Sequence, residues 1–375
     1  MSDFTRCSRC VMDNGSDSTI RFDENGVCNY CTTAVRQMPS VYFPNAEGES
    51  KLKSLIDKLK REGQGKAYDC LMGISGGLDS SYLAYLGAVK WKLRILAIHI
   101  DDGFDTDLAK ENIENLCRKA GIELISYAPD AEQFNDLTKA FFLAEVANAA
   151  IPQDNVLFSC LYKLAAKHKV KYFLSGGNFA LESILQKGDN STFDKVFIKD
   201  IHRRFGSKPI DKIPLMSHWQ RLWIAKVKGI KTYRPLNYID YNKNRAICEL
   251  EEFCGFRYYE AKHLENTLTK MIQLHWFYRK FGVDKRKSHL SSLIVSGQLS
   301  REEALKELEK PISNPEDMNR DVDYVLNKIG LGRDVFDKLL SSPGKHSHDY
   351  KTDRLFRMFQ SLIDSLGIDK KKLVQ

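Results

Sequence analysis

Residues 68–82 constrain the fold of this chain more than any other stretch. They run YDCLMGISGGLDSSY, an apolar segment followed by a glycine pair between serines, and residues 83–90 continue as a helix-compatible segment. A buried strand, a glycine loop and a helix in direct succession favour an anion site, because glycines admit close approach to the backbone and the helix start offers free N–H groups. Asp79 alone would repel phosphate, so its place in this loop predicts a Mg²⁺ ion between carboxylate and phosphate.

A glycine pair alone would indicate a flexible turn, but the full sequence S-G-G-L-D-S after a strand is more specific. It resembles the loop of the ATP-pyrophosphatase (PP-loop) superfamily, which includes the synthetase domains of asparagine synthase and GMP synthase and several tRNA-modifying enzymes. The resemblance implies that ATP is cleaved between its α- and β-phosphates. A kinase loop would end in Gly-Lys-Ser/Thr, whereas Lys66 is followed by Ala67. The residues expected to bind pyrophosphate and Mg²⁺ are Gly73, Ser75, Gly76, Gly77, Asp79 and Ser80.

Length and composition set the class of protein. A chain of 375 residues with 43% hydrophobic residues is long enough for one large α/β domain with additions, or for two domains. The net charge of +8 is mild and suits anionic substrates such as nucleotides without requiring a nucleic acid. No stretch approaches the roughly 20 apolar residues that span a bilayer, and the first residues lack an apolar signal segment. We therefore expect a cytoplasmic protein with no membrane partner.

Four cysteines near the N-terminus have metal-site spacing. Cys7 and Cys10 form one CxxC pair, and Cys28 and Cys31 form a second pair seventeen residues later. Two such pairs predict one structural Zn²⁺ held by four thiolates, in a segment too short and polar to build its own core. Disulfides, a catalytic zinc and an iron–sulfur cluster are the alternatives. The other five cysteines lie in apolar contexts and are expected in the core: Cys70, Cys117, Cys160, Cys248 and Cys254.

The remaining chain alternates between strand and helix patterns. This order predicts an α/β fold whose parallel-sheet PP-loop domain is Rossmann-like, as in adenine nucleotide alpha hydrolases, with a zinc module before it and helices after it. The expected divisions are 1–35 for the zinc module, 36–66 for a linker punctuated by prolines and a helix, 67–258 for the PP-loop domain and 259–375 for the helical region. Expected strands after the first are 94–100, 123–127, 171–175 and 233–236, and expected helices include 50–61, 106–119, 134–150, 155–168 and 242–254.

Polar residues follow two of the expected strands. In parallel sheets ligands bind beyond the carboxyl ends of the strands, which places Asp101 and Asp102 at the site, although capping of the helix at 106–119 is an equal alternative. His99 within an apolar run is more commonly a structural histidine. The PP-loop resemblance implies that Ile98, His99 and Ile100 lie against adenine through their backbone. A second glycine-lined strand end, Gly176, Gly177 and Asn178, is expected to approach phosphate or substrate, with a simple turn as the alternative.

Two later segments carry dense charge. Residues 190–234 interleave basic and aromatic side chains, which fits an RNA surface, a sugar-nucleotide lid or, more simply, a solvated insertion. Lys262, His263 and Glu265 then lie within one helical turn. The run FGVDKRKSHLSSLIVSGQLSREEAL follows at residues 281–305 and contains Lys285 and Arg286.

Taken in order, the paired CxxC start, SGGLDS, LSGGN, KHLE and this last run resemble the N-acetyl sugar amidotransferase family of bacterial surface-polysaccharide and O-antigen biosynthesis, the WbpG-like proteins. The resemblance covers roughly residues 4–310 and weakens at 266–270 and beyond 311. It implies that ATP adenylates the acetamido oxygen of a nucleotide-linked or free sugar, and that ammonia then displaces AMP to leave an acetamidino group.

The resemblance also implies residue roles and partners. Lys262, Lys285 or Arg286 would neutralise charge during transfer of the α-phosphate, and His263 and Glu265 would orient substrate or take a proton from ammonia. No cysteine of the chain lies in a glutaminase context. The resemblance implies a separate class I glutaminase and a cyclase-like subunit as partners that supply ammonia, with the zinc module and residues 200–231 as expected docking surfaces.

Two other functions fit parts of the pattern. A PP-loop enzyme acting on tRNA, a thiolase or a lysidine-type ligase, would share zinc knuckles and basic charge, but a thiolase normally has a further cysteine pair where this chain has only Cys160. A zinc-ribbon adaptor with an inactive nucleotide domain is the weaker alternative, because the loop retains both serines and Asp79.

Overall fold

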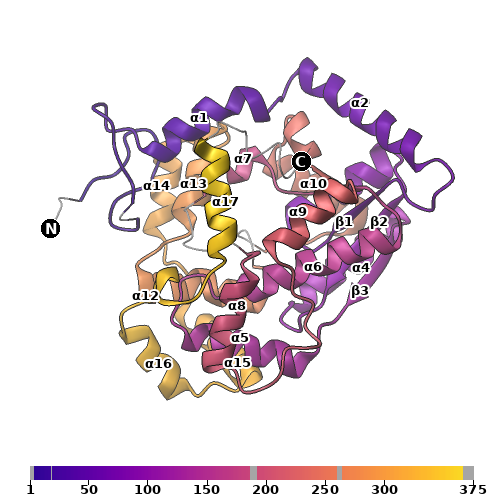
Figure 1. The fold of residues 1–375 in the computed structure, drawn as a ribbon. Coiled ribbons are helices and arrows are strands. Elements are labelled where there is room, and N and C mark those ends of the chain that lie inside the picture. The colour runs from indigo at the N-terminus through magenta and orange to yellow at the C-terminus, as the bar shows by residue number, and fades with distance from the viewer. Residues whose placement is uncertain (1–3, 18, 186–191, 260–263, 366–375) are drawn as a thin grey trace.

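A five-stranded parallel sheet forms the framework of the fold and lies toward the right of Figure 1. The structure is a computed structural model, and it describes residues 4–17, 19–185, 192–259 and 264–365. The strands are β1 (Cys70–Gly73), β2 (Ile95–Ile100), β3 (Glu123–Tyr127), β4 (Tyr172–Leu174) and β5 (Lys231–Tyr233), in the order β3-β2-β1-β4-β5. Because the chain order reverses between β1 and β4, a crevice opens at the carboxyl ends of these two strands, where ligands bind in such sheets.

The register shows why β1 is almost wholly apolar. Leu71 lies opposite Leu96 of β2 on one side and Phe173 of β4 on the other, so this strand is covered by sheet and helices on every side. Apolar clusters fill both faces of the sheet, one including Cys70, Met72 and Leu83 and the other including Leu71 and Leu161. The predicted parallel α/β fold is therefore confirmed.

Helices connect the strands and cover the sheet. They are α3 (Leu78–Tyr85) with its π-helical continuation η1 (Leu86–Lys90), α4 (Asp107–Ala120), α5 (Ala131–Leu143), α6 (Ile151–Lys167), α7 (Phe179–Glu182), α8 (Lys195–Phe205), α9 (His218–Val227), the 3₁₀ turn η2 (Pro235–Tyr238) and α10 (Lys243–Cys254). The aromatic residues of the basic segment lie partly on the surface, with Trp219 42% and Trp223 52% exposed.

Several predicted boundaries were wrong. The helix expected at 134–150 begins at Ala131 and ends at Leu143, because Glu145 takes φ +55° and its carboxylate binds Lys280 of a distant helix. The next helix begins at Ile151, since Pro152 is compatible with the first helical turn. The last strand ends at Tyr233 rather than continuing to Leu236, because Pro235 starts a 3₁₀ turn.

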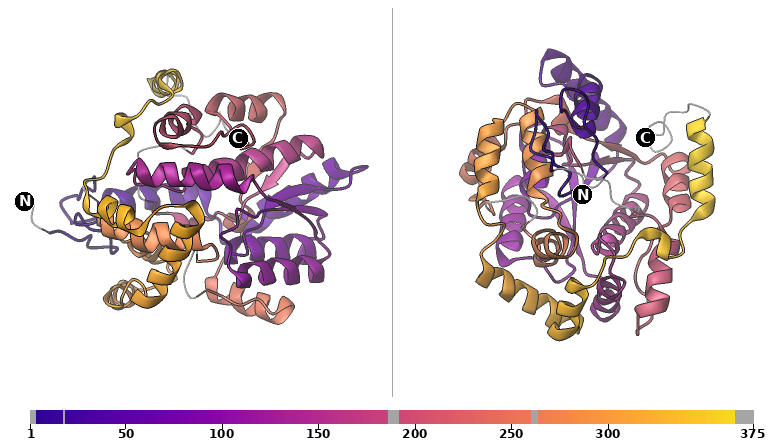
Figure 2. Two further views of the ribbon diagram at one scale, coloured as in Figure 1. Left: turned by 90° about the horizontal axis from the view of Figure 1, so that it is seen from below. Right: turned by 90° about the vertical axis from the view of Figure 1, so that its left-hand side faces the viewer.

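The C-terminal region is helical, as predicted (Figure 2). Its helices are α11 (Thr267–Met271), continued by the π turn η3 (Ile272–Trp276) and α12 (Phe277–Phe281), then α13 (Arg286–Val295), α14 (Arg301–Glu309), α15 (Pro315–Ile329), α16 (Arg333–Ser341), the 3₁₀ turn η4 (Ser347–Asp349) and α17 (Arg354–Ser365). Trp276 and Phe336 share a core with Phe141 and Phe142 of α5, so these helices pack on the sheet domain rather than apart from it. Phe356 of α17 stacks on His218 of α9 with ring centroids 4.1 Å apart.

The N-terminal module leads through α1 (Asn29–Val41) into α2 (Ala46–Gly63). The expected linker is shorter than predicted, because Pro39 lies inside α1 and only residues 42–45 separate the two helices. Cys248 is exposed, so its predicted place in the core was wrong, whereas the four other unpaired cysteines are buried. In the described part of the chain, every helix is too short or too polar to cross a membrane.

Candidate functional site

The glycine loop between β1 and α3 is held in a fixed shape. Gly76 has φ +78°, and a Cβ there would lie 2.7 Å from the carbonyl oxygen of Ala109 in α4, so only glycine fits. Ser75 Oγ accepts a bond of 3.3 Å from the N–H of Gly77. Ser80 Oγ accepts one of 3.4 Å from the N–H of Ser75 and donates to the carbonyl of Gly77. The predicted loop residues thus converge on one turn whose hydroxyls and N–H groups can face an anion.

Asp79 in the first turn of α3 has a partner that the sequence did not reveal. Tyr241, which is 1% exposed, donates a hydrogen bond of 2.5 Å to Asp79 Oδ1. Burial and the neighbouring Asp79 carboxylate raise the pKa of Tyr241 well above its usual value, so the phenol stays protonated and donating. This bond fixes one oxygen of the carboxylate and orients the other, as a metal-binding carboxylate requires.

The second glycine-lined strand end packs directly on the loop. A Cβ at Gly176 would lie 2.9 Å from the backbone nitrogen of Ser80, so the end of β4 touches the start of α3. Asn178 is 2% exposed and its side chain caps α7 by accepting from the N–H of Leu181. Gly176 and Gly177 therefore approach the predicted phosphate position, whereas Asn178 has a structural function in this arrangement.

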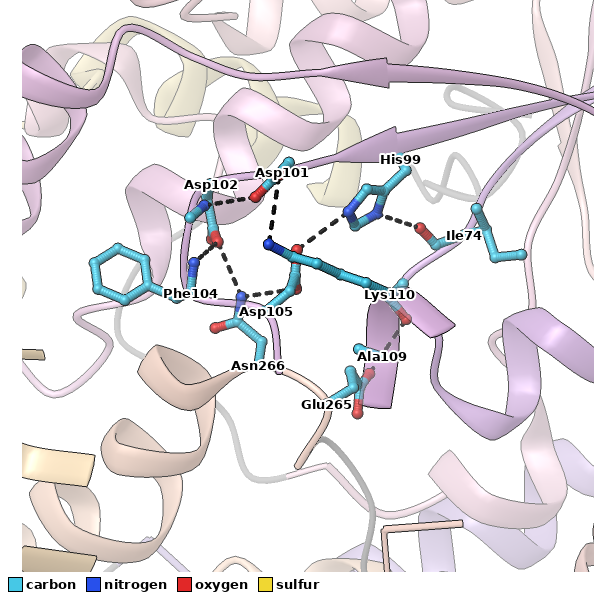
Figure 3. A network of polar contacts seen from close by, with 12 residues as sticks. Ile74, His99, Asp101, Asp102, Phe104, Asp105, Ala109, Lys110, Glu265 and Asn266 are labelled. Carbon is cyan, nitrogen blue, oxygen red and sulfur yellow. Dashed lines mark hydrogen bonds and ion pairs between the residues drawn. The ribbon is translucent and has the colours of Figure 1, made fainter. Parts of the chain in front are cut away.

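His99 at the end of β2 ties the loop to the segment after the strand. Its Nδ1 lies 3.0 Å from the carbonyl oxygen of Ile74, and its Nε2 lies 3.1 Å from Asp105 (Figure 3). Burial lowers the pKa of His99, but the Asp105 carboxylate outweighs it and the net shift is upward. A protonated His99 would thus form an ion pair beneath the loop.

Asp102 belongs to a buried network beside this pair. One oxygen accepts from the N–H of Phe104 and from Asn266 Nδ2, each at 3.0 Å (Figure 3). The other oxygen accepts from Gln153. Burial, together with the nearby Asp105, raises the pKa of Asp102 to about 6. Helix capping by Asp101 or Asp102 was the wrong alternative, because Thr106 caps α4.

Glu265 is the predicted catalytic residue that lies at the loop. Its Oε1 accepts from Ser75 Oγ at 3.2 Å, and a Cβ at Gly77 would lie 2.6 Å from the same oxygen. Its backbone carbonyl accepts from the N–H of Thr106, which anchors it after β2. Lys262 and His263 lie outside the described residues, so their predicted functions stay predictions.

A cavity of about 1590 Å³ extends from the loop to the C-terminal helices. The predicted residues that line it are Gly73, Ser75, Gly77, Asp79, Ser80, His99, Ile100, Gly176, Gly177, Glu265, Lys285 and Arg286. Ile98, Gly76, Asp101 and Asn178 are not among the described lining residues. Arg286 is engaged, since its guanidinium binds Asp284 at 2.8 Å and the carbonyl of Lys310 at 2.8 Å.

Sequence reasoning missed Lys243, the first residue of α10. It lines the cavity, and its Nζ lies 4.7 Å from the ring centroid of Tyr258. Burial lowers the pKa of Lys243 even though Glu307 and Asp79 act to raise it. Neither Lys243 nor Tyr241 belongs to a recognisable motif, and only the packing of α10 against α3 brings them to the loop.

The four N-terminal cysteines lie close enough together to hold one metal ion. Their sulfur atoms all lie within 4.8 Å of one another, and all four residues are fully buried. The sulfurs of Cys7 and Cys31 are 4.0 Å apart and those of Cys10 and Cys28 are 3.8 Å apart, close to the roughly 3.8 Å edge of a tetrahedron with zinc–sulfur bonds of about 2.3 Å. The donor set therefore fits a tetrahedral, thiolate-bound ion.

The C-terminal region matches a known protein family. Residues 265–363 match the family model described as "LPS biosynthesis protein WbpG-like, C-terminal domain". These residues therefore resemble a WbpG-like C-terminal domain, and the chain has a parallel α/β fold. This match confirms the predicted resemblance for this part of the chain, and the residues that it covers include Glu265, Lys285 and the far wall of the cavity. The predicted end of the resemblance near residue 310 was wrong, because the match extends to residue 363.

Two curated relatives cover different parts of the chain. An uncharacterized protein of Methanocaldococcus jannaschii is 24% identical over 308 residues, which is 82% of this chain and 94% of that protein. A glutamine-hydrolyzing GMP synthase of Campylobacter jejuni is 32% identical over 133 residues, but the match covers only 33% of this chain and 24% of the synthase.

Two solved structures were also found. The NH3-dependent NAD synthetase of Campylobacter jejuni is 15% identical with a TM-score of 0.29, and the match covers 56% of this chain and 93% of that one. The U34-tRNA thiolase NcsA of Methanococcus maripaludis is 14% identical with a TM-score of 0.31, covering 81% and 88%. Because both TM-scores are low, we draw no inference from these two structures.

Proposed function

We propose that this protein is an ATP-dependent, AMP-forming amidotransferase that converts the acetamido group of a nucleotide-linked sugar into an acetamidino group, in lipopolysaccharide or O-antigen biosynthesis. One observation carries the proposal: a single cavity joins the S-G-G-L-D-S loop to a wall supplied by the WbpG-like domain. One ligand at the loop and one at that wall can therefore meet, as transfer of AMP to an acceptor requires.

The loop residues bind the part of ATP that leaves as pyrophosphate. The N–H groups of the turn and the start of α3 face the anion, with Ser75 and Ser80 as hydroxyl donors. Asp79, fixed by Tyr241, offers the oxygen ligand that Mg²⁺ prefers, and the ion would neutralise charge on the phosphates. Lys243 lies on the same side and adds a positive charge there.

The acceptor reaction then has two steps. The amide oxygen attacks the α-phosphorus and pyrophosphate leaves, which gives an O-AMP imidate. Ammonia adds to the imidate carbon, loses a proton, and AMP departs with the former amide oxygen. We assign the removal of that proton to Glu265, whose carboxylate lines the cavity and lies 3.2 Å from Ser75 Oγ.

The proposal includes a resident ion and partners. Zn²⁺ is the ion that the four-thiolate site would hold, with a structural rather than catalytic function because no ligand position stays open. A separate class I glutaminase with a cyclase-like subunit would supply ammonia, and the reaction would take place in the cytoplasm.

The test is mass spectrometry of an incubation with ATP, Mg²⁺, ammonium chloride and a panel of UDP- and CMP-linked diacetamido sugars. Exchange of one oxygen for NH lowers the sugar mass by about 1 Da, with AMP and pyrophosphate as co-products, and fragmentation distinguishes an amidine from an amide. Formation of ADP, or AMP release stimulated by bulk tRNA with no sugar changed, would contradict the proposal and favour the tRNA-modifying alternative.

A further inference from the structure

The cavity is larger than one small ligand needs. Its volume of about 1590 Å³ exceeds the roughly 300–1,000 Å³ usual for a ligand pocket. One end contains the glycine loop, and another part is lined by α13 and by the segment between α14 and α15 of the WbpG-like domain. There is room for a second ligand beside the nucleotide, and the question is what chemistry that second part would recognise.

Lys285 lies in this second part, away from the loop. Its Nζ is 5.5 Å from the ring centroid of Phe277 in α12. Asn266, which caps α11 and contacts the end of β2, precedes Phe277 by eleven residues of almost continuous helix, a rise of about 16 Å. Lys243, by contrast, lies close enough to Asp79 for that carboxylate to affect its pKa. The two lysines therefore serve different parts of the cavity.

The other cations near Lys285 pair with carboxylates and leave it without a carboxylate partner in the described part of the chain. The other cations that line the same wall are each paired with a carboxylate: Lys270 with Asp321 at 2.7 Å, Lys310 with Glu307 at 2.6 Å and Arg286 with Asp284 at 2.8 Å. Lys285 has no ion pair or hydrogen bond from its ammonium within the described ranges, and burial lowers its pKa. A partly buried ammonium without a carboxylate partner is unfavourable unless a ligand brings the missing negative charge.

His289 of α13 adds a second polar side chain to this part of the cavity. It lines the cavity four residues after Lys285, on the same face of α13. We propose that Lys285 and His289 form a second anion site, which binds the phosphate of a nucleotide-linked acceptor. The inference rests on the proposed function and adds to it the residues that bind the phosphate of the acceptor.

The experiment measures binding by calorimetry on the full chain, in the presence of saturating α,β-methylene-ATP so that the loop site is filled. The probes are UDP and, in parallel, CMP. The variant is Lys285→Met, and the matched control is Lys306→Met, which removes the same charge from the exposed face of α14 outside the cavity. We expect K285M to weaken binding of the nucleotide probe at least about tenfold, as for the loss of one charge-assisted hydrogen bond, and K306M to leave it unchanged.

Other outcomes overturn the proposal. One such outcome is that the wild-type protein binds neither UDP nor CMP. Another is that K285M binds the nucleotide probe as tightly as the wild type does. A third is that K285M fails to bind α,β-methylene-ATP. Lys285→Arg, which retains the charge, should retain the probe and so distinguishes a lost contact from a misfolded wall. Because amidine formation is assayed separately, K285M that binds the nucleotide probe as wild type does, while the wild-type protein forms the amidine, would refute the phosphate site and leave the proposed function standing.

Discussion

At the scale of single residues, the Tyr241–Asp79 hydrogen bond carries a first prediction. Tyr241→Phe removes the donor and leaves the ring in place, so Asp79 loses the group that orients it toward Mg²⁺. We expect the Mg²⁺ concentration for half-maximal activity to rise about tenfold, the lower end of the effect of losing a residue that orients a metal ligand. The control is Tyr82→Phe, which loses a hydroxyl bonded to Glu249 outside the cavity. An equal change in both variants would refute a specific function of Tyr241.

His99 gives a second prediction at this scale, in the pH dependence of stability. Its pKa is raised in the folded chain, so its contribution is fully present below the unfolded value of about 6.5 and disappears as the pH rises through the folded pKa. His99→Gln should therefore lower the unfolding temperature more at pH 6 than at pH 9. Scanning calorimetry at the two pH values measures the difference, and a larger loss at pH 9 would contradict the ion pair with Asp105.

At the scale of elements, α13 and α14 join the metal module, which is the N-terminal segment with the four cysteines, to the cavity wall. Arg301 at the start of α14 donates to the carbonyl oxygens of Cys10 and Cys7, each at 3.1 Å. Lys287 of α13 binds Asp13 at 2.6 Å, and Ser291 accepts from the N–H of Val11. The metal module thus supports the helix whose other face lines the cavity with Lys285 and His289.

Arg301→Gln tests this coupling. We expect a loss of about 2 kcal/mol in the free energy of unfolding. Two charge-assisted hydrogen bonds disappear, and the carbonyl oxygens of Cys7 and Cys10 lose their donor. The bound metal should also pass to a colorimetric chelator faster than in wild type. Arg333→Gln is the control, since its exposed pairs with Asp323 and Asp337 contribute about 1 kcal/mol or less. Unchanged metal release in R301Q would mean that α14 does not support the module.

At the scale of the whole molecule, metal removal should affect more than the first residues. The apolar cluster around the four cysteines includes Phe179 and Ile184 near α7 and Val295 of α13. Chelation should therefore lower the midpoint of the main unfolding transition by about 5 °C or more, and added Zn²⁺ but not Mg²⁺ should restore it. A main transition that stays in place while a separate small one disappears would show an independent module.

The features that could be predicted from the sequence alone are those that depend on residues close together in the chain. Three such features are the paired CxxC spacing, the strand–loop–helix unit around Gly76 and the alternation of strands and helices. Each depends on residues a few positions apart, so it can be recognised in the sequence without a structure. The parallel sheet, the four-cysteine site and the helical C-terminal region were all predicted on this basis.

The residues that complete the site meet only when the chain has folded. Tyr241 reaches Asp79 across 162 positions, and Glu265 reaches Ser75 across 190, and no local pattern encodes either meeting. The same holds for the end of α5, where Glu145 turns to bind a buried lysine of α12, and for the separation of Lys285 from the loop. Such pairings depend on how whole helices pack, since hydrophobic burial positions the helices and their polar groups meet only as a result.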